Sequence, residues 1–540
     1  ITQQLVKLRL LSREKTFIRK IKELILSVLV EGNYSKNQIL EMYLNEVNYG
    51  GPVYGIEQAA VTFFGKNAKN LTLSQSAFLA GLPQAPSRYS PFADNLEASY
   101  ARRDEVLRRM REDGYITPEQ EAQAQAEELI FNNSAIKIEA PHFVMYVRQL
   151  LAEKYGEEMV NSGGLVVRTT LDLELQNQVQ EIVTNEVNSL AKMRISNGAA
   201  LVTNPKTGEI LAMVGSKNYF DFQNDGQVNV TVRERQPGSS IKPLTYALAM
   251  ETKGYSPASL ILDAPITYHF KGGPDYSPKN YDGKFHGQVT LREALASSYN
   301  IPAVKLLDEL GKDAEIDQAE AMGITTWEDR NRLGLSLTLG GGEVKMIDMA
   351  QLYGTFANLG LTVEEDPFLE ILDYQGKTLY QNRCALFGQC DSKTKRTLSE
   401  ATSYQISSVL SDNAARTPAF GPQSVLYIPG QEVAVKTGTT NNLRDNWTIG
   451  YITDRLVAVW VGNNDNQTMS YVASGITGAS PIWQKIILTQ LDEEKPHHFN
   501  VPTSIEKVNY CGKDEYFRAG AVPAVVCKSV KNPDNQPAEQ

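Results

Sequence analysis

The stretch "RQPGSSIKPLTYALAME" (Arg235–Glu251) places Ser239 three residues before Lys242, at the predicted start of a helix. Residues three apart face the same way on a helix, so Ser239 can present its hydroxyl to the Lys242 amine, whereas Ser240 cannot. Pro243 has no N–H and therefore denies the Ser239 carbonyl its usual helical partner. Because S-x-x-K also occurs by chance, the alternative is a polar cap at an ordinary helix start.

Two further segments carry the groups that a Ser–Lys pair needs. A serine hydroxyl is a poor nucleophile until a base takes its proton, and a lysine base must be neutral. The segment "ASSYNIPAV" holds Ser298 and Asn300, and "VKTGTT" holds Lys436, a second cation that can lower the pKa of Lys242. Taken singly, the first segment can be a helix cap and the second a turn.

The "VKTGTT" segment also suits a peptide substrate. The hydroxyl groups of Thr437 and Thr439 can hold a carboxylate. Gly438 removes a side chain where a substrate backbone can pair with the edge of a strand.

The surrounding pattern predicts an antiparallel sheet. "GAALVTNPKTGEILAMVGS" (Gly198–Ser216) reads as a β-hairpin, and helical stretches occupy much of 240–410. Strands return in "EVAVKTGTT" and "NWTIGYITDRLVAVWVGN", and the helix "PIWQKIILTQL" follows. A hairpin, then helices, then strands and a helix indicate an antiparallel sheet with helices on its faces.

The N-terminal part has a different periodicity. Residues 1 to about 130 read as almost wholly helical, with apolar residues spaced by three and four in "FIRKIKELILSVLVE" and "KNQILEMYLNEV". Residues 127–139 lose this periodicity and read as a linker. "GLVVRTTLD" then predicts a strand that runs into a helix capped by Asp172.

Length and charge limit the class of protein. A chain of 540 residues exceeds what one hydrophobic core supports, so we expect at least two domains. The formal net charge of −10 argues against a nucleic-acid partner, and the five histidines form no ligand cluster, so we expect no metal site from them. No apolar run spans a bilayer and no secretory signal is visible. Because the chain opens on Ile1 inside a predicted helix, we expect it to be a fragment.

The four cysteines fall as two local pairs, Cys384 with Cys390 and Cys511 with Cys527. Neither spacing resembles a zinc knuckle. We expect disulfides between these neighbours, which implies an oxidising compartment outside the cytoplasm. Four free thiols are the alternative.

The S-x-x-K, S-x-N and K-T-G segments together are similar to the motif set of the penicillin-binding proteins and serine β-lactamases. Residues 190–495 resemble the transpeptidase domain of penicillin-binding proteins, and "LTLGGGEVKMIDMAQLYGTFANLG" and "RDNWTIGY" match it as well. Earlier in the chain, "ITQQLVK", "RKIKE", "KNQILEMYLN" and "RRDEVLRRM" resemble successive motifs of the lysozyme-like peptidoglycan glycosyltransferases. The whole chain therefore resembles the bifunctional class A penicillin-binding proteins.

This resemblance implies a fold and a division into parts. The expected fold is multidomain: a mainly α, lysozyme-like glycosyltransferase domain, incomplete at its start, and then an α/β transpeptidase domain with an antiparallel sheet flanked by helices. The expected parts are the glycosyltransferase domain (1–125), a connecting region (126–190), the transpeptidase domain (191–495) and a C-terminal extension with a cysteine pair and a disordered tail (496–540).

The resemblance also implies roles in a D,D-transpeptidase that cross-links stem peptides. Ser239 attacks the carbonyl between two terminal D-alanines, and Lys242 takes its proton. Ser298, supported by Lys436, passes a proton to the leaving amine, and Asn300 holds a peptide amide. Thr437, Gly438 and Thr439 bind the substrate, and the hydroxyl groups of Thr437 and Thr439 hold its carboxylate. The transpeptidase needs no cofactor.

In the first domain the resemblance implies a site for a lipid-linked disaccharide. The residues assigned to it are Gln3, Gln4, Lys7, Arg19, Lys20 and Glu23. The cations suit a pyrophosphate, and a divalent cation can take part there. Arg19 and Glu23 are one turn apart, so the alternative for this pair is a simple helix ion pair. The family's catalytic base glutamate lies upstream of the "ITQQ" motif, so we expect no glycan polymerisation by this chain.

The implied partners are lipid II, nascent peptidoglycan and β-lactam antibiotics. The implied location is the extracytoplasmic side of the cell membrane, with an anchor in an N-terminal segment absent from this sequence. Two alternatives use the same serine: a D,D-carboxypeptidase or β-lactamase, in which water takes the acyl group, and a penicillin-binding sensor. A sensor would carry a signalling segment, and none is visible in the sequence.

Overall fold

The structure is a computed structural model. It describes residues 1–9, 17–50, 53–89, 96–132, 138–221, 224–270, 274–390, 394–440, 442–470, 476–492 and 495–524. The chain divides into two compact units, Ile1–Ile138 and Glu139–Gln540, which confirms that it has more than one domain. The predicted disordered tail and Cys527 lie outside the described residues.

The first unit is mainly helical, as expected. Its helices are α1 (Thr2–Arg9), α2 (Phe17–Asn33), α3 (Lys36–Glu46), α4 (Ile56–Phe64), α5 (Leu73–Gly81), α6 (Pro86–Tyr89), α7 (Leu96–Glu112) and α8 (Pro118–Ala126). A small antiparallel ribbon of β1 (Asn48–Gly50) and β2 (Val53–Tyr54), which the sequence did not suggest, interrupts them. Capping boxes at Ser35, Thr72 and Thr117 start three of the helices, because each side chain accepts from the backbone N–H three residues later.

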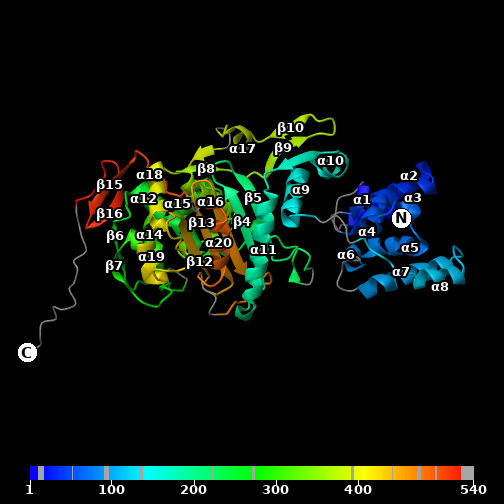
Figure 1. Cartoon of the computed structure of the whole chain (residues 1–540), viewed down its shortest axis with the longest axis horizontal. Helices are drawn as coiled ribbons and strands as arrows, with labels where there is room; N and C mark the ends of the chain where they lie inside the picture. Colours follow the sequence, from blue (N-terminus) through cyan, green and yellow to red (C-terminus); the bar gives the residue numbers. More distant parts are fainter. Residues whose placement is uncertain are drawn as a thin grey trace, which may run out of the picture. The chain divides into compact units, whose positions relative to one another are not determined.

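The second unit is built around a five-stranded sheet in the order β12-β13-β14-β4-β5 (Figure 1). Its strands are β4 (Asn197–Asn204), β5 (Glu209–Val214), β12 (Ala434–Thr439), β13 (Asp445–Tyr451) and β14 (Leu456–Gly462). Every neighbouring pair is antiparallel, with Trp447 opposite Trp460 and Leu201 opposite Ala458. The predicted hairpin and the predicted antiparallel sheet are therefore confirmed.

Helices cover both faces of this sheet. α11 (Leu173–Ser189) and α20 (Ala479–Leu488) pack on one face, and α16 (Met346–Ala357) and α18 (Glu400–Ser411) contact strands from the other. Alternate residues of a strand enter different cores: Ala199 and Leu201 join one, and Ala200 and Val202 the other. This alternation explains why the strands read as continuously apolar in sequence.

The remaining elements of the second unit surround this core. Its other helices are α9 (Pro141–Tyr155), α10 (Glu157–Ser162), α12 (Lys242–Lys253), α13 (Leu291–Ala296), α14 (Asn300–Leu310), α15 (Lys312–Ala321), α17 (Arg383–Phe387) and α19 (Asn413–Phe420). Its small sheets contain β3 (Val166–Thr169), β6 (Leu260–Asp263), β7 (Gly287–Thr290), β8 (Leu361–Val363), β9 (Phe368–Leu372), β10 (Thr378–Gln381), β11 (Thr394–Arg396), β15 (Ile505–Tyr510) and β16 (Lys513–Arg518).

α11 lies in the stretch that we expected to be a connecting region. The side chain of Asp172 caps it, as predicted, by accepting from the N–H groups of Glu174 and Leu175. Its buried residues Val179 and Val183 pack into the same core as β4 and β14. α11 is therefore part of the layered second unit, and the division of the chain into four parts stays a prediction.

The C-terminal hairpin of β15 and β16 is tied to the second unit by ion pairs. The Glu515 carboxylate accepts from Arg292 Nε at 2.9 Å, and Arg518 donates to the Glu251 carboxylate at 2.9 Å. Arg292 belongs to α13, which leads into Ser298, so the hairpin supports the segment that carries the second motif.

The cysteine pairing agrees with the expectation where the structure describes it. Cys384 and Cys390 form a disulfide, and Cys511 is disulfide-bonded as well. Four free thiols are therefore excluded. A structural disulfide fits an oxidising compartment.

Candidate active site

Ser239 lies in a short 3₁₀ turn, Gly238–Ile241, that leads directly into α12. Ser239 is partly exposed, whereas Ser240 is completely buried and its Oγ donates to the Pro237 carbonyl at 2.7 Å. The hydroxyl of Ser240 is thus engaged in the turn, and that of Ser239 faces a pocket. The choice of Ser239 as the nucleophile stays a prediction.

Three glycines let the backbone of this turn pack directly against its neighbours. A Cβ on Gly238 would lie 2.7 Å from the Thr439 carbonyl oxygen, and one on Gly340 would lie 2.2 Å from the Gly238 nitrogen. A Cβ on Gly438 would lie 2.2 Å from the Pro237 carbonyl oxygen. We expected the missing side chain of Gly438 to leave room for a substrate, but the structure fills this room with the Ser239 turn.

Lys242 is completely buried, and its amine is held by the segment 298–300. The Nζ donates to the Ser298 carbonyl at 2.6 Å, to Asn300 Oδ1 at 2.7 Å and to the Tyr299 carbonyl at 3.1 Å. Although both residues are described, no hydrogen bond joins this amine to the Ser239 hydroxyl. The amine of Lys242, and not the hydroxyl of Ser239, therefore connects the S-x-x-K motif to the S-x-N motif.

The pKa of Lys242 is held well below its usual value. Burial is the largest cause, and the positive charge of Lys436 is the next. The Asp263 carboxylate opposes this effect. A buried amine with a lowered pKa can exist as the neutral base that a serine nucleophile requires.

Ser298 sits between the two lysines. Its Oγ accepts from Lys436 Nζ at 2.8 Å and from Lys242 Nζ at 3.4 Å. The backbone of Ser298 has a φ of +63°, which is unfavourable for a residue with a side chain. Such strain persists only where the surroundings impose it, and it gathers at functional sites.

Lys436 is buried on β12, an edge strand of the sheet. Its Nζ also donates to the Thr437 carbonyl at 2.9 Å. Burial, followed by the charge of Arg416, lowers the pKa of Lys436 to about 7. Sequence reasoning missed Arg416, which is buried on α19 and belongs to no motif.

Residues from each of the three motifs line one pocket of about 320 Å³. The predicted residues that line it are Ser239, Ser298, Asn300, Thr437 and Thr439. The lining residues that sequence reasoning missed include Asn280, Asp282, Tyr299, Leu339 and Phe420. A larger cavity of about 920 Å³, lined partly by α9 and α16, contains none of the motif residues.

The candidate residues of the first unit lie on two helices that contact each other. Gln3, Gln4 and Lys7 are exposed on α1, which packs against α2. On α2, the buried Glu23 carboxylate accepts from Lys20 and, at 3.1 Å, from Arg19. The hydrogen bond from Lys20 is the largest cause that lowers the pKa of Glu23, and the charge of Lys7 adds to it. The helix ion pair that was the alternative for Arg19 and Glu23 is thus present.

In the part of the chain that the structure describes, no group of three or more His, Cys, Asp or Glu side chains is placed to hold a metal ion. Among the helices described here, none combines the length and the apolar character needed to cross a bilayer.

Both units of the chain are similar to known proteins. Residues 1–111 match the family described as "Transglycosylase", and residues 198–487 match "Penicillin binding protein transpeptidase domain". The chain is 33% identical to Penicillin-binding protein 1F of Bacillus subtilis, over 94% of this chain and 69% of that protein. It is 31% identical to Penicillin-binding protein 1A of Aquifex aeolicus, over 95% of this chain and 79% of that protein. The crystal structure of Penicillin-Binding Protein 1A from Haemophilus influenzae matches with a TM-score of 0.63 at 25% identity, covering 92% of this chain and 93% of that one.

Proposed function

This chain belongs to the bifunctional class A penicillin-binding proteins, and on that premise we propose a role for each residue of its sites. The family combines a serine D,D-transpeptidase with a peptidoglycan glycosyltransferase, and its function is peptidoglycan synthesis. That this chain does not itself polymerise glycan stays a prediction. Penicillin-binding proteins bind β-lactams and act on peptidoglycan precursors, and the transpeptidase needs no cofactor.

In acylation, the Ser239 Oγ attacks the carbonyl carbon between the two terminal D-alanines of a stem peptide. Neutral Lys242 takes the hydroxyl proton, and the tetrahedral intermediate collapses with cleavage of the C–N bond. The proton reaches the leaving amine through Ser298, whose Oγ lies 3.4 Å from Lys242 Nζ. The products are an acyl-enzyme and free D-alanine.

In the second half of the reaction, the amine of a neighbouring stem peptide attacks the ester of the acyl-enzyme. The amine loses a proton to the Ser298–Lys242 relay, the C–O bond breaks, and Ser239 regains its proton. The observation that carries this proposal is the position of the Ser298 hydroxyl between the amines of Lys242 and Lys436. One hydroxyl in contact with both amines can move a proton in either direction.

The substrate would bind along β12, whose outer edge has no neighbouring strand among the residues that the structure describes. An extended peptide can pair with such an edge, and Asn300 would hold one of its amides. Thr437 and Thr439 would bind the terminal carboxylate, with Gly438 between them. The backbone N–H groups of Ser239 and Thr439 would stabilise the oxyanion, an effect worth ~3–4 kcal/mol per donor.

In the first unit, cationic and amide side chains of α1 and α2 would bind the pyrophosphate and sugars of lipid II. The residues proposed for this are Gln3, Gln4, Lys7, Arg19 and Lys20, and the buried Glu23 carboxylate would hold Arg19 and Lys20 in place. The described residues do not fit a resident divalent cation, because the Glu23 carboxylate is already paired with Arg19 and Lys20.

We also propose that the protein works on the extracytoplasmic side of the cell membrane, on lipid II and nascent peptidoglycan. The Cys384–Cys390 disulfide supports this setting, because disulfides persist in oxidising compartments.

Labelling with a fluorescent penicillin tests the proposed transpeptidase site. The full chain is incubated with the label, digested and mapped by mass spectrometry. We expect the label on Ser239 and its loss in Ser239→Ala. Label on another residue of the wild type would overturn the proposal.

A further inference from the structure

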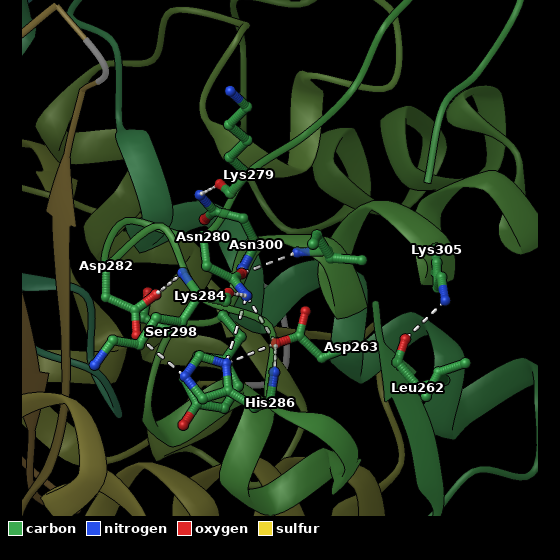
Figure 2. Close-up of polar contacts among 12 residues, drawn as sticks. Leu262, Asp263, Lys279, Asn280, Asp282, Lys284, His286, Ser298, Asn300 and Lys305 are labelled. Carbon is green, nitrogen blue, oxygen red and sulfur yellow. Dashed lines mark hydrogen bonds and ion pairs between the residues drawn. The ribbon is translucent and has the colours of Figure 1, made fainter. Parts of the chain in front are cut away.

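A buried carboxylate outside the three motifs is connected to the site by hydrogen bonds. Asp263 ends β6 and is completely buried. Its Oδ2 accepts from Asn280 Nδ2 at 2.7 Å, from the His286 backbone N–H at 3.0 Å and from His286 Nδ1 at 2.7 Å (Figure 2). Its Oδ1 is also buried and has no hydrogen-bond partner among the described residues.

Asn280 carries this connection to the start of α14. Its Oδ1 accepts from the backbone N–H of Asn300 at 2.7 Å and from that of Ile301 at 3.4 Å. The first amides of a helix lack partners within the helix, and the cap residue of α14, Tyr299, makes no side-chain cap. Asn280 therefore caps α14 from another part of the chain.

His286 supports the same segment from one face. Its ring stacks on the ring of Tyr299, with centroids 3.9 Å apart and planes 8° from parallel. Besides its contact with Asp263, the ring meets the Asp282 carboxylate through Nε2 at 3.1 Å. Each ring nitrogen of His286 thus contacts a carboxylate while the ring packs on Tyr299.

We call Asp263, Asn280 and His286 the Asp263 cluster. It contacts the segment 298–300, which is strained at Ser298 and supplies the oxygens that hold the Lys242 amine. We propose that the Asp263 cluster is a positioning unit that holds this strained segment in the form that surrounds the Lys242 amine. The proposal rests on the function proposed above, because it gives Lys242 the role of the base.

The charge of Asp263 supports this proposal. A buried carboxylate with one unpaired oxygen is costly, and a neutral side chain of the same shape could also accept hydrogen bonds. The charge acts on Lys242, since it opposes the lowering of the pKa of that amine by burial and by Lys436. The charged groups that act on Lys242 are therefore Lys436 on β12 and Asp263 on β6, while Arg416 on α19 acts on Lys436. Asp263 keeps the amine basic enough to take a serine proton.

The test measures acylation of the full chain by a fluorescent penicillin, as a rate constant per titrated active site and as a function of pH. We expect Asp263→Asn and Asn280→Ala to lower this rate constant ~10–100-fold, because small displacements of catalytic groups have effects of this size. In Asp263→Asn the acid limb of the pH profile should also move to lower pH, because the pKa of Lys242 falls further without the opposing charge.

The chain offers a matched control. His269 Nδ1 lies 2.8 Å from Asp275 Oδ1, a histidine–aspartate contact of nearly the same length, but both side chains are exposed. Asp275→Asn should leave both the rate constant and the pH profile unchanged. If Asp263→Asn folds poorly, His286→Phe keeps a ring to stack on Tyr299 but removes both ring nitrogens, and it should lower the rate constant of the folded fraction.

The possible outcomes separate this proposal from the proposed function. Label on Ser239 in the wild type, with unchanged rate constants in Asp263→Asn and Asn280→Ala, overturns the role of the Asp263 cluster alone. A loss of folded protein with a normal rate constant per active site also overturns it, because the cluster would then be merely structural. Label on a different residue in the wild type overturns the proposed function, and the role of the cluster with it.

Discussion

The Lys436 Nζ lies 2.8 Å from the Ser298 Oγ, although the two residues are 138 positions apart in the chain. One residue belongs to an edge strand and the other to a strained turn before α14. This contact joins the K-T-G motif to the S-x-N motif. Lys242 joins the S-x-N motif to the S-x-x-K motif, so all three motifs are in contact. The chemistry proposed for the chain depends on these three segments meeting, and the following predictions test how they do so.

The two neighbouring serines should respond differently to substitution. Ser239→Ala should abolish labelling by penicillin. Ser240→Ala should still be labelled but should be less stable by about 1 kcal/mol, because it loses the buried hydrogen bond to the Pro237 carbonyl. Mass spectrometry and thermal unfolding measure the two effects. Unlabelled but folded Ser240→Ala would contradict the assignment.

Removing the charge of Lys436 should shift the pH dependence of acylation. Lys436 lowers the pKa of Lys242, so in Lys436→Met this pKa rises and the acid limb of the rate profile moves to higher pH. The rate at neutral pH falls as well, because Ser298 loses a donor. Lys305→Met is the control. It also removes a lysine amine, but that amine donates to the Leu262 carbonyl, whereas the amine of Lys436 donates to Ser298. A limb that moves to lower pH would refute the proposed coupling.

Glu315 should make the stability of the second unit depend on pH. It is completely buried on α15, where both carboxylate oxygens accept from Thr245 Oγ1 at 3.0 Å. Burial raises its pKa from 4.5 to about 8. Its contribution to stability is therefore full below pH 4.5 and is lost as the pH rises through 8. Glu315→Gln should remove a few kcal/mol of this dependence, and denaturant unfolding at several pH values measures it. Identical pH curves for both proteins would contradict the prediction.

Adding a methyl group at Gly438 should disturb the Ser239 turn. The new Cβ would lie 2.2 Å from the Pro237 carbonyl oxygen, so β12 and the turn must separate. We expect Gly438→Ala to cost ~1–3 kcal/mol and to lower the acylation rate constant at least about tenfold. Gly334→Ala is the control, because no atom of the described residues would lie within 4 Å of its new Cβ. Normal acylation by Gly438→Ala would show that the turn tolerates the shift.

Peptide mapping without reduction checks the cysteines. We expect a peptide that joins Cys384 to Cys390, as in the structure, and another that joins Cys511 to Cys527, as the sequence predicts. Crossed pairs would refute the second expectation.

Much of the fold could be predicted from the sequence because it follows from local patterns. The hairpin of β4 and β5 was visible because two apolar runs flank a turn around Pro205 and Gly208. The start of α11 was visible because Asp172 has the side chain that a helix cap requires. The residues of the three motifs were visible because their spacing is similar to that of a known family. Each of these signals lies within a short stretch of chain, so the sequence alone contains it.

Other features depend on segments that meet only in the folded chain, and tertiary structure alone decided them. The need for glycine at 438 comes from contact with Pro237, and the positive φ of Ser298 is imposed by its surroundings. The role of Asn280 as a cap for α14, the burial of Arg416 beside Lys436 and the charge of Asp263 near Lys242 are of the same kind. In each case the partner is distant in sequence, and distance, burial and charge act between atoms in space. The sequence thus indicated which residues are proposed to carry the chemistry, and the tertiary structure decided the directions of their pKa shifts and the strained backbone at Ser298.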